Sequence, residues 1–215
     1  MRKLGLSVAA ACMAFGGAAA HADDGLRGYF HLGAGQVSLN PNSVEMSIGG
    51  AAVPGAGFDA STEYPVVGEL GIFVYGNWAL SASLTSSVLT ENTGTGPLAA
   101  TPNIGSDSFM LSTLTGTYHF EPTPWMSPYV GGGVSYFHAT GAYDGVVTNL
   151  AIDHAWGSVV QAGIDFNLTE RAGAFVDLKQ YFVGIDATGS FFGAPVLASA
   201  DIDPLLVHAG VSYRF

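Results

Sequence analysis

The feature that most constrains the fold is a two-residue alternation of apolar side chains, which begins near residue 26 and returns throughout the chain. It occurs in segments of about ten residues, a length with which a tilted strand can cross a bilayer. Alternation with period two is typical of a β-strand that has one face in an apolar medium. The sequence therefore predicts an all-β protein.

Eight such segments are present, and the connectors between them differ in length. The segments are residues 26–35, 66–75, 78–88, 113–120, 129–136, 156–168, 174–182 and 205–215. Short connectors (76–77, 121–127 and 169–171) alternate with long ones (38–64, 91–107, 139–153 and 184–203). Short turns at one end and long loops at the other are typical of outer-membrane barrels. We therefore expect an eight-stranded antiparallel transmembrane β-barrel with short periplasmic turns and long extracellular loops.

The composition agrees with a membrane protein that has no membrane-spanning helices. Only 11% of the 215 residues are charged, against about 25% in average soluble domains. No apolar run of about 20 residues, the length of a spanning helix, follows the first few positions. Six Lys and Arg against 17 Asp and Glu residues give a net charge of −11, which argues against nucleic acid as a partner.

The first residues have the pattern of a secretory signal peptide. Arg2 and Lys3 precede an apolar stretch over residues 4–15, and Ala20-His21-Ala22 fits an A-x-A cleavage site. A short membrane anchor, or a lipoprotein signal cut at Cys12, fits this stretch less well. We expect a signal peptide at 1–22 and one outer-membrane barrel over 23–215, exported to the bacterial outer membrane.

Aromatic residues separate this barrel from a soluble β-sandwich, which also alternates but places polar residues outside. Two aromatic girdles are predicted, one at the short turns and one at the long loops. Their members are Trp78, Trp125, Phe166, Tyr213 and Phe215 at the first, and Tyr64, Phe109 and Trp156 at the second. The chain ends on an aromatic residue, Phe215, which resembles the terminal signal read by the outer-membrane assembly machinery.

The opposite face of the strands carries charge into the predicted lumen. The expected lumen-facing network consists of Arg27, His31, Glu69, His119, Asp165, Asp177, Lys179, His208 and Arg214. We expect His31 near His208, and Asp165 level with Asp177 across the turn at 169–171. Buried charges need partners. Two interpretations remain open: a structural network that closes the periplasmic half, or a gate in a passage.

The upper half of the lumen is predicted to be more apolar, with Phe73, Leu111 and Phe137 forming its wall. An apolar wall there favours an apolar solute that enters from outside. Ten acids fall in the long connectors and are expected to give a solvated surface: Glu45, Asp59, Glu63, Glu91, Asp107, Asp144, Asp153, Asp186, Asp201 and Asp203. The alternative is divalent-cation bridging to lipopolysaccharide phosphates, although the spacings match no calcium loop.

Several motifs in order resemble one family of small outer-membrane proteins. They are Leu32-Gly33-Ala34-Gly35, Tyr118-His119-Phe120, Pro128 to Tyr136, Trp156-Gly157, Gln161 to Phe166, Asp203-Pro204 and Gly210 to Phe215. Together they resemble the OmpW family. The resemblance implies a narrow passive channel for small hydrophobic molecules, with lateral release into the membrane, among outer-membrane lipids and lipopolysaccharide.

Catalytic patterns are absent from the sequence. No serine lies two residues after a histidine or within G-x-S-x-G, and the histidines form no H-x-H or H-x-x-H pair. We expect no catalytic residue, metal or cofactor, and no enzyme activity. The alternatives to a channel are an adhesion barrel that acts through its acidic loops and, less expected, a lipid-modifying enzyme.

Overall fold

The computed structural model describes residues 27–101, 103–120, 123 and 125–215. The predicted signal peptide at 1–22 lies outside these residues. Within the described parts of the chain, no helix is both long and apolar enough to span a membrane.

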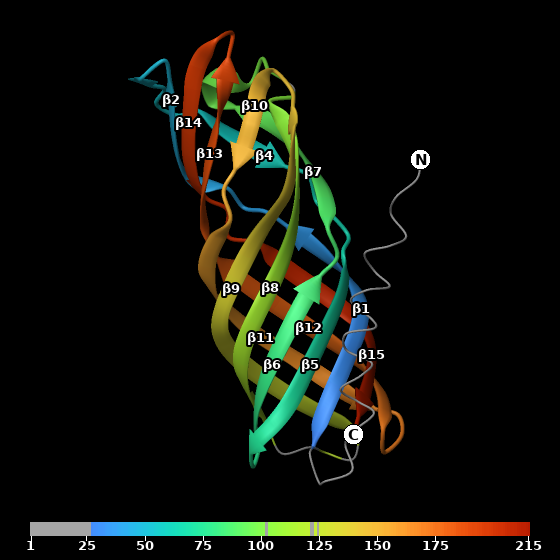
Figure 1. Ribbon diagram of the computed structural model, residues 1–215. Coiled ribbons are helices and arrows are strands. Elements are labelled where there is room, and N and C mark those ends of the chain that lie inside the picture. The colour runs from blue at the N-terminus through green and yellow to red at the C-terminus, as the bar shows by residue number, and fades with distance from the viewer. Residues whose placement is uncertain (1–26, 102, 121–122, 124) are drawn as a thin grey trace.

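Eight strands close into an antiparallel barrel, as predicted (Figure 1). In order around the barrel they are β1 (Gly28–Ser38), β5 (Val66–Tyr75), β6 (Trp78–Thr85), β8 (Gly105–His119), β9 (Met126–Asp144), β11 (Ala155–Asn167), β12 (Ala172–Phe182) and β15 (Leu205–Arg214). Pairing of β1 with β15, in which Tyr29 lies opposite Arg214, closes the ring. Because the ring is closed, no edge strand faces the membrane.

The sequence predicted long loops between the barrel strands. In the structure these long connectors contain further strands. They are β2 (Asn42–Ile48), β3 (Ala51–Ala52), β4 (Gly57–Ala60), β7 (Val88–Thr95), β10 (Val147–Ile152), β13 (Gly184–Phe191) and β14 (Ala194–Asp201), with the 3-10 turn η2 (Gly96–Leu98). They extend the barrel wall beyond the upper end of the eight strands (Figure 1).

This extracellular extension is built as two sheets. On one side β4 and β7 add to the upper part of β8, which itself pairs with the upper part of the 19-residue strand β9. On the other side a five-stranded sheet has the order β10-β13-β14-β2-β3. The two sheets enclose a space above the barrel.

The barrel exterior is apolar, as the alternation predicts. Leu80, Val160 and Val211 are 49%, 50% and 63% exposed on its outer face. Trp78, Trp125 and Tyr213 are exposed near the short turns, and Tyr64 and Trp156 near the extension. The prediction for Phe109 is wrong: it is 1% exposed and points inward, because the unbroken alternation of β8 places it on the same face as Leu111 and Thr113.

We predict that Val160→Arg, in the middle of β11, destabilises the protein in lipid vesicles by about 2–4 kcal/mol, because it places a charge in the bilayer interior. Val146→Arg is the matched control, since Val146 is exposed in the extracellular turn between β9 and β10. Urea unfolding measures both. Equal stability of the two variants would contradict the assignment of this face to lipid.

Candidate functional site

Lys179 is the centre of the charge network inside the barrel. Its side chain is 0% exposed, and Nζ lies 2.6 Å from Glu69 Oε2, 2.8 Å from Gln161 Oε1 and 3.1 Å from Asp177 Oδ1. Alternation along β12 directs Asp177 and Lys179 inward together, while Glu69 reaches them from β5 across the lumen. The ammonium group therefore lies between two carboxylates and an amide in a space without room for bulk water.

Two buried tyrosines extend this network around the barrel. Tyr29 donates a hydrogen bond to Glu69 Oε1 at 3.2 Å, and Tyr129 donates one to Asp177 Oδ2 at 2.8 Å. His208 Nδ1 lies 3.4 Å from Asp177 Oδ1. Each carboxylate that faces Lys179 is thus held by a phenol as well, which is the partner set that buried charges require.

A second cluster lies nearer the periplasmic end and is centred on Asp165. His31 Nε2 lies 2.8 Å from Asp165 Oδ1, and Arg214 Nη2 lies 3.6 Å from Asp165 Oδ2. Arg214 is 30% exposed on its side chain, whereas His31 and Asp165 are buried. The arginine therefore marks the point at which the network meets periplasmic water.

Phe73 belongs to this lower end and not to the upper wall where the sequence had placed it. The Arg27 guanidinium lies 5.0 Å from the centre of its ring, and the His119 ring packs edge-on at 4.9 Å. The reason is strand direction: β5 runs toward the short turn at 76–77, so Phe73 is near its periplasmic end. Leu111 and Phe137 do point into the upper interior.

Two expected neighbours are separated in the structure. Asp165 lies opposite Phe175, and Asp177 lies opposite Gly163, so the two acids occupy different levels. The β11–β12 hairpin is symmetric about Glu170, in the middle of the expected turn at 169–171, and this register places Phe175 opposite Asp165. His31 and His208 were also expected to lie near each other. The ring of Phe175 lies between them: it stacks on the His31 ring with centres 4.2 Å apart, and its centre is 5.2 Å from that of the His208 ring.

Hydroxyl groups fill the opposite side of the lumen, a feature that the sequence analysis missed. Ser81 and Thr115 are hydrogen-bonded at 2.8 Å, and Ser83 and Thr113 at 2.6 Å. Thr115 also donates to Gln161 Oε1 at 3.2 Å, which joins this side to Lys179. The alternating serines and threonines of β6 and β8 were a sufficient signal.

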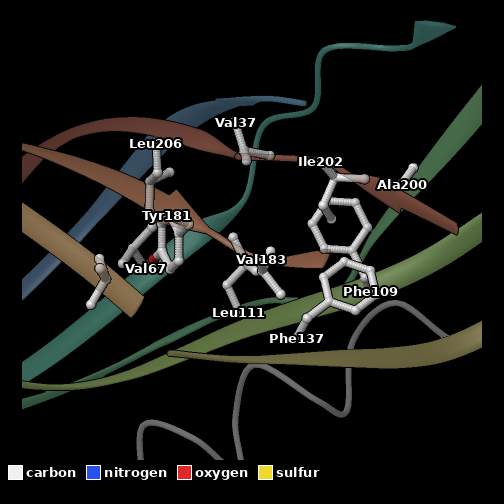
Figure 2. Close-up of a cluster of buried hydrophobic side chains, with 11 residues drawn as sticks. Val37, Val67, Phe109, Leu111, Phe137, Tyr181, Val183, Ala200, Ile202 and Leu206 are labelled. Carbon is white, nitrogen blue, oxygen red and sulfur yellow. The ribbon is translucent and has the colours of Figure 1, made fainter. Parts of the chain in front are cut away.

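An apolar layer closes the barrel above the network (Figure 2). Figure 2 shows Tyr181, Val67 and Leu206 packed together on one side, and Phe109 beside Phe137 on the other. The rings of Phe109 and Phe137 stack at 5.1 Å. All five side chains are at most 2% exposed. The layer therefore separates the extracellular end from the charge network.

Directly above this layer lies an apolar cavity of about 90 Å³ between the two extracellular sheets. Phe137, Ala200 and Ile202 belong both to the apolar layer and to the cavity wall. Most of the remaining wall is aliphatic and comes from the predicted loops: Leu39, Met46, Ile104, Val147, Leu150, Ile152, Ile185, Ala187, Val196 and Ala198, with Phe58. The alternation of Val196, Ala198 and Ala200 was the signal in the sequence for these inward positions.

One acid of the long connectors is buried in this wall, contrary to the expectation of a solvated acidic surface. Asp107 is 5% exposed and accepts a hydrogen bond from Asn92 Nδ2 at 2.7 Å. It lies in the extracellular part of β8, above Ser112. Ser112 pairs with Tyr136, and Tyr136 pairs with Trp156 of the aromatic girdle near the extension. Burial raises the pKa of the Asp107 carboxyl above its usual value, and the bond from Asn92 offsets this only in part.

The wall of the cavity has a seam between β9 and β10. The ladder between β9 and β11 ends at Phe137 and Ala155, and above it β10 pairs with β13 alone among the described strands. Two bonds to side chains bridge the seam: the Ala139 N–H donates to His154 Nδ1, and the Leu150 N–H donates to Asp144 Oδ1, both at 3.1 Å. Its lower end lies beside Tyr136 and Trp156, whose rings are tilted against each other with their centres 4.6 Å apart.

Comparison with known proteins identifies this architecture. The model of the OmpW family matches residues 27–215, which is nearly the whole described chain. The chain belongs to the OmpW family. As an OmpW protein it is an outer-membrane β-barrel of the bacterial cell.

Similar proteins agree with this OmpW assignment. The chain is 24% identical to the dibenzothiophene metabolism operon protein PahQ of Pseudomonas aeruginosa, over 80% of this chain and 82% of PahQ. Its fold matches the outer membrane protein OprG of P. aeruginosa with a TM-score of 0.81 and 16% identity, over 88% of this chain and 96% of OprG. The outer membrane protein AlkL of Ectopseudomonas oleovorans matches with a TM-score of 0.69 and 21% identity, over 88% and 90%.

The last residue of this OmpW protein helps to close the barrel. Phe215 exchanges backbone hydrogen bonds with Gly28, at 2.9 and 3.0 Å, so the ends of the first and last strands are joined. Recognition of Phe215 by the assembly machinery stays a prediction.

We predict that Lys179→Met destabilises this OmpW barrel by about 3–5 kcal/mol, because it leaves Glu69 and Asp177 buried without their cation. Adding Glu69→Gln to this variant should recover part of the loss, because one of the two uncompensated charges is removed. Arg171→Met, in an exposed turn, is the control. Urea unfolding in vesicles measures all three, and a neutral Lys179→Met would contradict the role of the network.

The raised pKa of Asp107 predicts a pH dependence. An acid with a raised pKa in the folded state binds its proton more tightly when folded, so the folded protein gains stability from this residue as the pH falls. Asp107→Asn should therefore be more stable than the wild type at pH about 7, and the difference should vanish toward pH about 4, near the ordinary pKa of Asp. Unfolding curves across this range check the trend, and a difference that grows at low pH would refute it.

Proposed function

We propose that this protein is a passive route by which small hydrophobic molecules enter the outer membrane from outside. The single observation that carries the proposal is the position of the apolar cavity, which lies outside a barrel whose interior is sealed. Aliphatic residues dominate the wall of this cavity, and burial of apolar surface favours an apolar occupant.

The charge network supports this route as a seal rather than as a pore. A solute that moved down the barrel axis would have to displace the apolar layer and then break the contacts of Lys179, which is fully buried. Separating buried ion pairs is strongly unfavourable. Of the two interpretations left open by the sequence, the closing network is therefore the one we adopt.

The seam between β9 and β10 is the proposed exit. Cavity residues Phe137, Leu150 and Ile152 lie along it. Among the described residues, two side-chain bonds bridge it above the last backbone pair, and at its top the Val147 N–H donates to the Ile104 carbonyl at 3.1 Å. Opening this seam breaks few hydrogen bonds, whereas opening any complete ladder of the barrel would expose many backbone groups to lipid. Release would occur sideways through the seam, just above the level of Tyr136 and Trp156.

The relatives add support of a limited kind. PahQ is named for an operon of dibenzothiophene metabolism, and dibenzothiophene is an apolar aromatic compound. An apolar aromatic solute would suit the aliphatic cavity of this chain.

A disulfide across the seam tests the route. His138 and His154 continue the register of Phe137 and Ala155 by one residue, and facing residues have Cα atoms about 4.5–5.5 Å apart, within disulfide range. We expect the oxidised His138→Cys/His154→Cys protein to lose most of its transfer of naphthalene into vesicle bilayers, and reduction to restore it.

Val130→Cys/Ala162→Cys is the matched control, because these two residues face lipid in a complete part of the same β9–β11 ladder. Its oxidation should leave transfer unchanged. Undiminished transfer through the oxidised seam variant would contradict lateral release.

A further inference from the structure

The cavity contains one feature that a site for pure hydrocarbons does not need. Asp107 and Asn92 are its buried polar pair, placed on the neighbouring strands β8 and β7 in a wall that is otherwise almost entirely apolar. Burying a carboxylate beside aliphatic groups is unfavourable unless its oxygens are hydrogen-bonded. The pair therefore marks a position at which a polar group of a ligand has a partner.

The hydrogen bonds of this pair leave one acceptor available. Asn92 Nδ2 donates to Asp107 Oδ1 at 2.7 Å, and within the described residues no further hydrogen bond reaches the Asp107 carboxylate. Its other oxygen, Oδ2, can accept a bond from a donor inside the cavity. A hydrocarbon that filled the cavity would displace water from this oxygen and leave it without a partner.

We propose that the cavity selects apolar molecules that carry one hydroxyl group, with the hydroxyl donating to Asp107 Oδ2 and the apolar body lying against Leu150, Ile152 and Val196. This inference rests on the proposed entry of solutes through the cavity and names their chemical class.

A hydroxyl suits this position better than a charged donor. A neutral O–H loses much less hydration free energy on entering an aliphatic space than an ammonium group does. The increased pKa of Asp107 agrees with the poor solvation of this carboxylate. A hydrogen bond to such a group discriminates strongly, because the analogue without the donor leaves the acceptor unpaired.

Phenol and toluene form a matched pair of probes, since they differ only by a hydroxyl in place of a methyl group. Both are titrated into the wild-type protein in bicelles, and the amide NMR signals of Ile152 and Val196 report binding. We expect Asp107→Leu to lower the affinity for phenol about tenfold, the effect of one hydrogen bond to a charged group, and to leave toluene binding intact. Toluene binding also shows that the variant keeps its cavity.

Two further variants make the test specific. Asp107→Asn keeps one oxygen and the shape of the side chain, and should reduce phenol affinity in the same direction by a smaller factor. Asp59→Leu removes an exposed acid of β4 in the same extracellular sheet and should change neither affinity.

The outcomes separate this inference from the proposed function. If Asp107→Leu binds phenol as well as the wild type does, or loses both compounds equally, selection by Asp107 is wrong, while toluene binding by the wild type would still support the route for apolar solutes. If neither compound shifts the cavity signals of the wild type, the proposed function fails together with this inference.

Discussion

The structure depends on how a narrow barrel accommodates its own interior. Eight strands enclose a space that side chains nearly fill, and every inward position must therefore suit its neighbours across the lumen. Here Lys179 lies between Glu69 and Asp177, each of which also accepts a bond from a buried tyrosine. Such a set is stable only when complete, because an unpaired charge in this space is far more costly than an unpaired charge at the surface.

The position of this network decides where a ligand can bind. With charges, hydroxyl groups and the layer around Tyr181 filling the barrel, the described space for an apolar molecule lies in the extracellular extension. That extension consists of two sheets that meet without a continuous ladder at the seam between β9 and β10. The same construction thus produces an apolar cavity, a floor beneath it and a weak side wall.

The sequence was sufficient to predict the barrel but not its details. Alternation located the eight strands and the inward faces, because lipid imposes one rule on every outward position. The relative heights of inward residues depend on hairpin register, and the β11–β12 register is symmetric about Glu170. Phe175, and not Asp177, therefore lies opposite Asp165. Phe109 points inward because it lies on the same face of β8 as Leu111 and Thr113, an alternation that its assignment to the aromatic girdle overlooked.

The extracellular half was predicted least well, and for a physical reason. Long connectors with Gly, Ser and Asp were read as loops, yet their weaker alternation builds strands that pair with one another and extend the wall. Asp107 shows the consequence: an acid expected in solvent became a buried group beside Asn92. Asn92 lies close to Asp107 in sequence, but the rest of the cavity wall that buries the acid comes from the distant strands β10, β13 and β14, which reach it only after folding.

The most direct measurement of the central claim is the location of an apolar solute inside the protein. A small apolar nitroxide added to the labelled protein in lipid bicelles broadens the NMR signals of nearby residues. The account predicts broadening at Ile152, Val196 and His138, along the cavity and the seam, and none beyond the lipid background at Asp177 or Asp165. Broadening that continues down the barrel axis through Asp177 to Phe73 would contradict a sealed interior.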